Sequence, residues 1–110
     1  MYAEICSALQ DALAKLENTR AGLPAASAQG QSLDQAIASL KADLNAVMDD
    51  AVEDALENLQ NNNVENFLNA KVAVLNNVTQ SINNVANALS GAATAVSVAG
   101  DIASAALSLA

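Results

Sequence analysis

The chain has 110 residues, 53% of them hydrophobic, and a formal net charge of −8 from twelve acidic and four basic side chains. A chain of this length buries one core, so we expect a single helical domain over residues 1–110. The excess of negative charge repels phosphate backbones and excludes nucleic acid as a partner, and the lone Cys6 excludes an internal disulfide.

The first predicted helix covers residues 3–20, where apolar residues recur every three or four positions. Gly22 followed by Pro24 is a typical helix stop. Glycine can take a left-handed conformation, and proline cannot continue the ladder of backbone hydrogen bonds. Residues 21–31 are therefore expected to form a loop.

The second predicted helix covers residues 32–60. Ser32 and Gln35 have the spacing of a capping box, in which the serine hydroxyl accepts from a backbone amide and the glutamine side chain reaches back. An apolar stripe with steps of four and three residues follows and slips after Ala51. We therefore expect the contact face of this helix to rotate near residues 49–54.

The three asparagines at positions 61–63 predict the next break, because asparagine caps helices well. So short a connection forces the following helix, 63–90, to fold back antiparallel on 32–60 and form a helical hairpin. Gly91 favours a break or kink before a last helix over 92–109. One continuous helix through both segments is the alternative, since the heptad pattern does not stop there.

A heptad pattern of apolar residues runs from Leu75 to Ala106, as in the seam of a coiled coil. We expect this seam to be shielded by protein in the folded chain. Lys71 occupies an apolar position of the same pattern. Its long side chain either specifies the register of a partner or extends to the edge of the seam.

Together these elements predict an all-α fold. The hairpin of 32–60 and 63–90 would be completed to a three- or four-helix bundle by the N-terminal helix and the Ala-rich C-terminal helix. Because only Tyr2 and Phe67 are aromatic, the interior must consist of Ala, Val, Leu and Ile. Such side chains allow helices to approach closely but bury little area each, so the helices must be long.

The residue types that usually carry catalysis are scarce. The chain has no histidine, which excludes histidine general bases, Ser-His-Asp hydrolysis and histidine-ligated metals. One cysteine cannot build a thiolate zinc cluster, and no glycine-rich phosphate loop or dinucleotide-binding fingerprint occurs. We therefore expect a non-enzymatic protein with no catalytic residue, no metal and no cofactor.

Carboxylates crowd into the second half of the 32–60 segment. They are either a solvated helix face or a docking surface for a basic partner. A divalent-cation site is disfavoured, because the segment lacks the glycine and the alternating oxygen ligands of an EF-hand loop. The predicted acidic docking face consists of Asp49, Asp50, Glu53, Asp54 and Glu57.

Residues 66–110 contain only two charged side chains, Lys71 and Asp101. So neutral a segment is a core helix, a surface that pairs with another copy or another protein, or a membrane-inserting segment. A membrane span would have to accommodate five asparagines, which is costly. Small residues at intervals of four form a smooth ridge for close helix contact. The predicted partner-binding residues are Val85, Leu89, Gly91, Ala95, Val96, Ala99 and Ala103.

These patterns favour an interaction or assembly protein that acts through apolar helix faces, as a homo-oligomer or with another protein. The alternative is a membrane-active or secreted effector-like helical protein whose neutral C-terminal segment inserts into or binds a bilayer. A membrane is the less favoured partner of the two. The sequence carries no prediction of localisation.

Overall fold

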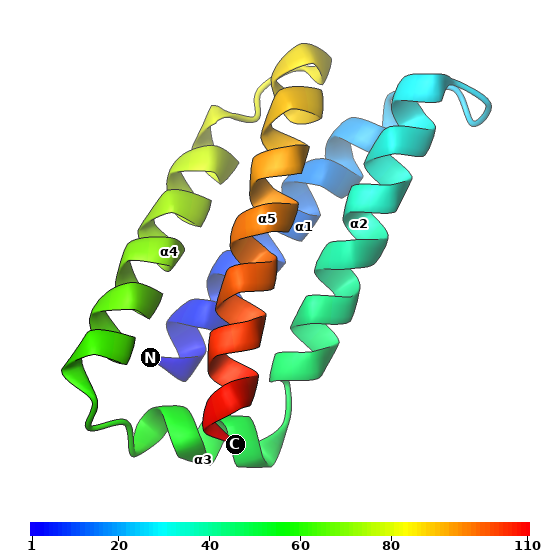
Figure 1. Cartoon of the computed structure of the whole chain (residues 1–110). Helices are drawn as coiled ribbons and strands as arrows, with labels where there is room; N and C mark the ends of the chain where they lie inside the picture. The colour runs from blue at the N-terminus through cyan, green and yellow to red at the C-terminus, as the bar shows by residue number, and fades with distance from the viewer.

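The computed structural model describes all 110 residues and contains five α-helices and no strand (Figure 1). The predicted all-α class is confirmed. The helices are α1 (Tyr2–Ala21), α2 (Ala28–Val47), α3 (Asp50–Glu57), α4 (Asn62–Ser81) and α5 (Val85–Leu109).

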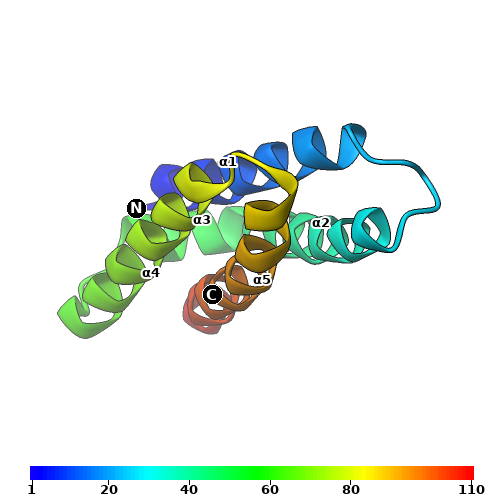
Figure 2. The same ribbon diagram turned by 90° about the horizontal axis from the view of Figure 1, so that it is seen from above.

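The four long helices run side by side, and the short α3 crosses one end of the molecule (Figure 1). Helix α5 packs on α2 and α4, and α1 packs on the same two helices from the other side. Figure 2 shows the α4–α5 pair inclined to the α1–α2 pair. Both chain termini lie at the end where α3 crosses. The molecule measures 46 × 22 × 17 Å along its principal axes.

The predicted hairpin of 32–60 with 63–90 is wrong. Helices α2 and α4 each pack along α1 and α5. The cause is a break at Met48, after which Asp49 caps α3 and its Oδ1 accepts a hydrogen bond from the Ala51 amide at 2.8 Å. The sequence predicted that the contact face of one long helix rotates here, but the structure has the end of α2 at this place. It sends the chain across the end of the molecule before α4 begins.

Two predicted helix starts are displaced. Ser27, not Ser32, caps α2, and its hydroxyl accepts from the Gly30 amide at 2.9 Å, so the loop is shorter than predicted. Helix α4 is capped by Asn61, whose side chain accepts from the amides of the two residues that follow Asn62. In both cases an earlier residue with a short polar side chain satisfies the free amides of the helix.

The predicted break at Gly91 is also wrong. The chain turns at residues 82–84, and the Asn84 side chain caps α5 by accepting from the Asn87 amide at 2.8 Å. Helix α5 continues through Gly91, where an added β-carbon would lie 3.3 Å from Cγ1 of Ile82. The glycine allows α4 and α5 to approach closely instead of ending a helix.

The core is aliphatic, as predicted. Its buried hydrophobic residues are all Ala, Val, Leu or Ile, while Phe67 is 44% exposed and Tyr2 is half-buried. Helix α5 contributes eight of them, namely Ala88, Ala92, Ala95, Val98, Ala99, Ile102, Ala103 and Ala106. Alanines on this helix let α2 and α4 pack closely against it on both sides.

The predicted apolar seam is buried only in part. Its buried members are Leu75, Ile82, Ala92, Ala99, Ala103 and Ala106, and its half-buried members are Val78, Val85, Leu89 and Val96. The buried stripe of α5 is centred about one residue away from the predicted one. The half-buried members are therefore left at the edges of the contact.

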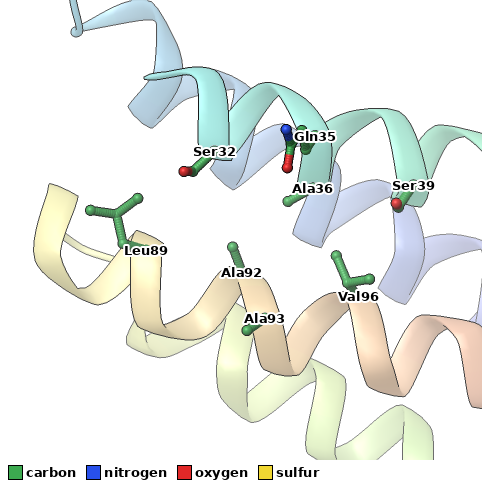
Figure 3. Close-up of a pocket in the computed structure, with 8 residues that line it drawn as sticks. All are labelled: Ser32, Gln35, Ala36, Ser39, Leu89, Ala92, Ala93 and Val96. Atoms are coloured by element: carbon green, nitrogen blue, oxygen red, sulfur yellow. The ribbon is translucent and has the colours of Figure 1, made fainter. Parts of the chain in front are cut away.

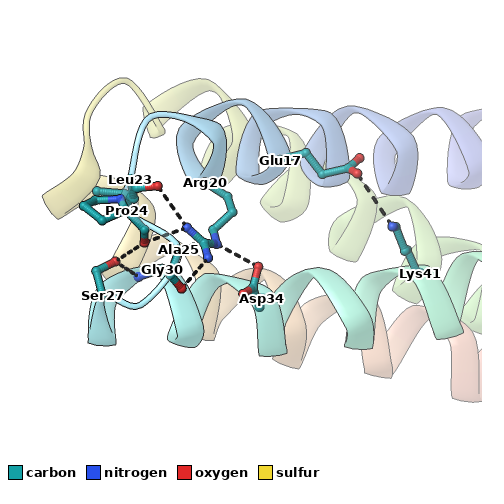
Figure 4. A network of polar contacts seen from close by, with 9 residues as sticks. All are labelled: Glu17, Arg20, Leu23, Pro24, Ala25, Ser27, Gly30, Asp34 and Lys41. Carbon is teal, nitrogen blue, oxygen red and sulfur yellow. Dashed lines mark hydrogen bonds and ion pairs between the residues drawn. The ribbon is translucent and has the colours of Figure 1, made fainter.

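Arg20 organises the connection between α1 and α2 (Figure 4). Its Nε lies 2.8 Å from Oδ1 of Asp34. Its other guanidinium nitrogens donate to three backbone carbonyls of the loop, those of Leu23, Pro24 and Ala25. Gly30 lies against this group, and a β-carbon there would be 2.7 Å from Cζ of Arg20. A β-carbon at position 30 would also lie 2.8 Å from the Ser27 hydroxyl, so a side chain there would displace the guanidinium or the capping hydroxyl.

We expect Gly30→Ala to destabilise the protein by about 1–2 kcal/mol, although alanine is the better helix former, because the new methyl displaces the guanidinium from its acceptors. In an Arg20→Ala background the loss should be smaller, since no guanidinium is displaced. Urea unfolding of the four proteins measures the difference.

The matched control is Gly100→Ala, where no atom lies within 4 Å of an added β-carbon. This change should stabilise the protein by about 0.5–1 kcal/mol. Equal losses from Gly30→Ala in both backgrounds would contradict the role given to Arg20.

Candidate interaction surfaces

The structure brings together no group of three or more His, Cys, Asp or Glu side chains that could hold a metal ion. Every buried side-chain nitrogen and oxygen atom has a hydrogen-bond partner. The grooves between neighbouring helices and the outer faces of the helices are where a partner can make contact.

One groove of about 450 Å³ lies between α2 and α5. Figure 3 shows Leu89, Ala92 and Val96 of α5 pointing toward α2, whose lining residues are Ala36 and three polar, uncharged residues. These polar residues are Ser32, Gln35 and Ser39. Leu89 and Val96 are two of the predicted partner-binding residues, and both remain half-buried at this groove.

The other predicted partner-binding residues are covered by the chain itself. Ala95, Ala99 and Ala103 are buried, Gly91 packs against α4, and Val85 is half-buried at the start of α5. The pattern predicts a ridge for close helix contact, and α2 and α4 of the same chain occupy it. The three alanines therefore form no exposed surface in the folded protein.

A second, more polar groove lies between α1 and α4. Its volume is about 510 Å³, and a neighbouring hollow of about 440 Å³ shares Asp11, Thr79 and Gln80 with it. Thr79 is the one buried polar residue, and its hydroxyl donates to the Leu75 carbonyl at 2.8 Å. Glu4 and Asp11 line this groove, the carboxylate of Glu4 lies 3.8 Å from the N-terminal ammonium of Met1, and Lys15 lines the neighbouring hollow.

The acidic docking face lies on and just before α3. All five of its carboxylates, those of Asp49, Asp50, Glu53, Asp54 and Glu57, are exposed, and no ion pair joins any of them to a cation. Asp49 caps the helix, and Asp50 and Glu53 lie in its first turn, where negative charge stabilises the helix dipole. Three of the five carboxylates thus stabilise the start of α3.

Tyr2 lies at the junction of α1 and α3. Partial burial raises the pKa of its phenol, and the neighbouring Cys6 thiol and the negative charges of Glu53 and Asp50 raise it further. The first turn of α1 is therefore close to the acidic start of α3.

The last two helices carry no net charge beyond their first turn. Lys71 and Asp101, the two charged residues of 66–110, pair with each other across α4 and α5, with 3.0 Å between Nζ and Oδ2. The Lys71 ammonium also lies 5.4 Å from the centre of the Phe67 ring. The whole net charge of −8 therefore belongs to residues 1–65.

Two large apolar side chains flank Lys71 on α4. Phe67 is 44% exposed and Val74 is 42% exposed, one turn to either side of the lysine. On α5, the residues one turn to either side of Asp101 are Ser97 and Ser104, and both are exposed. We call this surface the neutral face, and it consists of Phe67, Lys71, Val74, Ser97, Asp101 and Ser104. The sequence analysis did not identify Phe67 and Val74 as surface residues. Both lie outside the predicted apolar seam, and this position indicated that they could be exposed.

Asp43 of α2 is half-buried and makes no ion pair. Its partial burial raises the pKa of the carboxyl above the ordinary value of 3.8. A raised pKa in the folded state means that ionised Asp43 destabilises the fold. This loss of stability is fully present above the pKa that Asp43 has in the folded protein. It disappears as the pH falls to the pKa that the carboxyl has in the unfolded chain.

We therefore expect Asp43→Asn to raise the melting temperature at pH 7, and the gain to shrink as pH falls toward 3.8. Circular dichroism melts across this pH range measure it. Asp11→Asn, an exposed site on α1, controls for the general loss of one negative charge. A gain that is the same at all pH values would contradict the burial effect.

No protein-family model, no curated protein and no solved structure matches this chain. Its function is therefore argued from the surfaces themselves.

Proposed function

We propose that this protein is a non-enzymatic interaction or assembly protein that associates through the neutral face, and that its four long helices act as a bundle presenting that face. The observation that supports this proposal is the presence of two exposed large apolar side chains on a surface without net charge. The first 65 residues carry all of the net charge, while Phe67 and Val74 lie exposed on the uncharged part of the surface.

Electrostatics favours this face over the acidic docking face on α3. Two like-charged surfaces repel when their charges are brought together at an interface, and a face without net charge avoids that cost. Lys71 and Asp101 already neutralise each other within the face, at 3.0 Å.

Apolar area favours the same face. Burying an exposed large apolar side chain stabilises a complex, and aromatic side chains are common anchors at interfaces. Phe67 is the one phenylalanine of the chain, and it is outside the core. The half-buried Leu89 and Val96 at the α2–α5 groove offer a smaller apolar area on the other side of α5.

We expect light scattering to show a dimer or a larger species whose population rises with concentration, and the double variant Phe67→Ser/Val74→Ser to shift it to monomer. Both side chains are exposed, so circular dichroism should show an unchanged fold. The matched control is Met48→Ser, which removes an apolar side chain that is 55% exposed at the α2–α3 corner.

A wild-type chain that stays monomeric at high concentration would refute assembly through this face. An equal effect of Met48→Ser would show that the association is not specific to the face. Deleting α5 is not a useful test, because it removes eight buried residues of the core.

The length and composition of α5 support the alternative, a protein that acts on membranes. The helix has 25 residues, and an 18-residue stretch of it has a mean hydropathy of 1.5, so it is long and apolar enough to cross a bilayer. Its buried residues would first have to leave their contacts with α2 and α4. For this alternative we expect leakage and co-sedimentation of phosphatidylcholine vesicles together with a change in helicity. No co-sedimentation at neutral or acidic pH would dispose of it.

A further inference from the structure

We infer that the partner of the neutral face is a second copy of this chain, and that α4 of each copy lies antiparallel on α5 of the other. This inference rests on the proposed function and names its partner. It follows from a self-complementary arrangement of side-chain size and charge on the two helices.

The two helices carry the same spacing with opposite properties. On α4, Phe67 lies four residues before Lys71 and Val74 three residues after it. On α5, Ser97 lies four residues before Asp101, and a second serine, Ser104, lies three residues after it. Along the neutral face, α4 therefore carries a lysine between two large apolar side chains, and α5 carries an aspartate between two small serine side chains. Each set of three side chains forms a strip along its helix.

The ion pair fixes how these two strips are aligned. Helices α4 and α5 run antiparallel (Figure 1), and Lys71 contacts Asp101 at 3.0 Å. Because residues of a helix rise by about 1.5 Å each, Phe67 lies within about 1.5 Å of the level of Ser104, and Val74 lies within about 1.5 Å of the level of Ser97. Each large side chain of α4 is thus nearly level with a small side chain of α5.

The two copies can be related by a two-fold axis that runs parallel to α4 and α5. This axis lies just outside the neutral face, in front of the line midway between the two helices. It places α4 of each copy over α5 of the other and keeps every residue at its level. Lys71 then faces Asp101 of the second copy, and Phe67 faces Ser104 of the second copy. One surface used twice is the form that two-fold symmetric dimers require.

The surroundings of Asp101 leave room for this contact. No atom lies within 4 Å of an added β-carbon at the adjacent Gly100, so the backbone of α5 is open to approach there. Close approach at small residues increases the packing area between helices.

Charge selects a second copy over a basic partner protein. A basic partner would be drawn to the exposed, unpaired carboxylates of α3. The neutral face offers such a partner no net attraction. For a chain of charge −8, two copies repel less through this face than through the acidic docking face.

The test is a charge exchange between copies, using Lys71→Asp and Asp101→Lys. Either variant alone places like charges across the two-fold axis, so we expect its dimer dissociation constant to rise by about tenfold or more. An equimolar mixture should restore the dimer as a heterodimer, because each copy then supplies the charge that the other lacks. Native mass spectrometry distinguishes the heterodimer by mass.

The matched control is the same exchange at the ion pair between α1 and α2. Nζ of Lys41 lies 3.7 Å from Oε2 of Glu17, and both side chains are about half exposed. We expect Lys41→Asp and Glu17→Lys to leave the dimer unchanged. Circular dichroism confirms the fold of all four variants, since exposed ion pairs contribute only about 0–1 kcal/mol.

Failure of this inference differs from failure of the proposed function. A wild-type dimer that Phe67→Ser/Val74→Ser dissociates, but that no mixture rescues, keeps association through the face and overturns the two-fold pairing. A monomer at all concentrations overturns both. A monomer that binds phosphatidylcholine vesicles through Phe67 replaces the second copy with a membrane.

Discussion

The structure depends on close packing around α5. This helix lies between α2 and α4 and contributes six buried alanines, so its neighbours approach it on both sides. A larger side chain at Ala95 or Ala99, neither of which is exposed, would push two helices apart at once. The buried hydrophobic residues are accordingly all aliphatic.

The fold class and the kind of core could be predicted, because composition and helical periodicity act locally. The helix boundaries were harder. Several short polar residues compete to cap each helix, and caps differ by only about 1 kcal/mol, so packing decides between Ser27 and Ser32. Gly91 suggested a break, but its missing side chain allows contact with Ile82, a residue of the preceding turn.

The exposure of the residues predicted to bind a partner could be predicted only in part. A run of small apolar residues indicates that a helix will be covered, but not whether its own chain or another covers it. Ala95, Ala99 and Ala103 are covered by α2 and α4. The exposure of the acidic face followed from its like-charged spacing. Phe67 and Val74 could not be assigned to a surface until the pairing of α4 with α5 was known.

The charged side chains are unevenly distributed over the five helices. Three of the four basic side chains join neighbouring helices through ion pairs, Arg20 with Asp34, Lys41 with Glu17, and Lys71 with Asp101. None of these cations is left to balance the carboxylates of α3. The first three helices therefore carry most of the net charge, while α4 and α5 carry no net charge beyond Glu65 in the first turn of α4.

The position of Tyr2 has a spectroscopic consequence. The chain has no tryptophan and this single tyrosine, which lies where α1 meets α3. Tyrosine fluorescence therefore reports on the docking of the first turn of α1 and is blind to the alanine-packed middle of the molecule. A fluorescence change that precedes the loss of helical circular dichroism would mark fraying of this corner while the four long helices stay together.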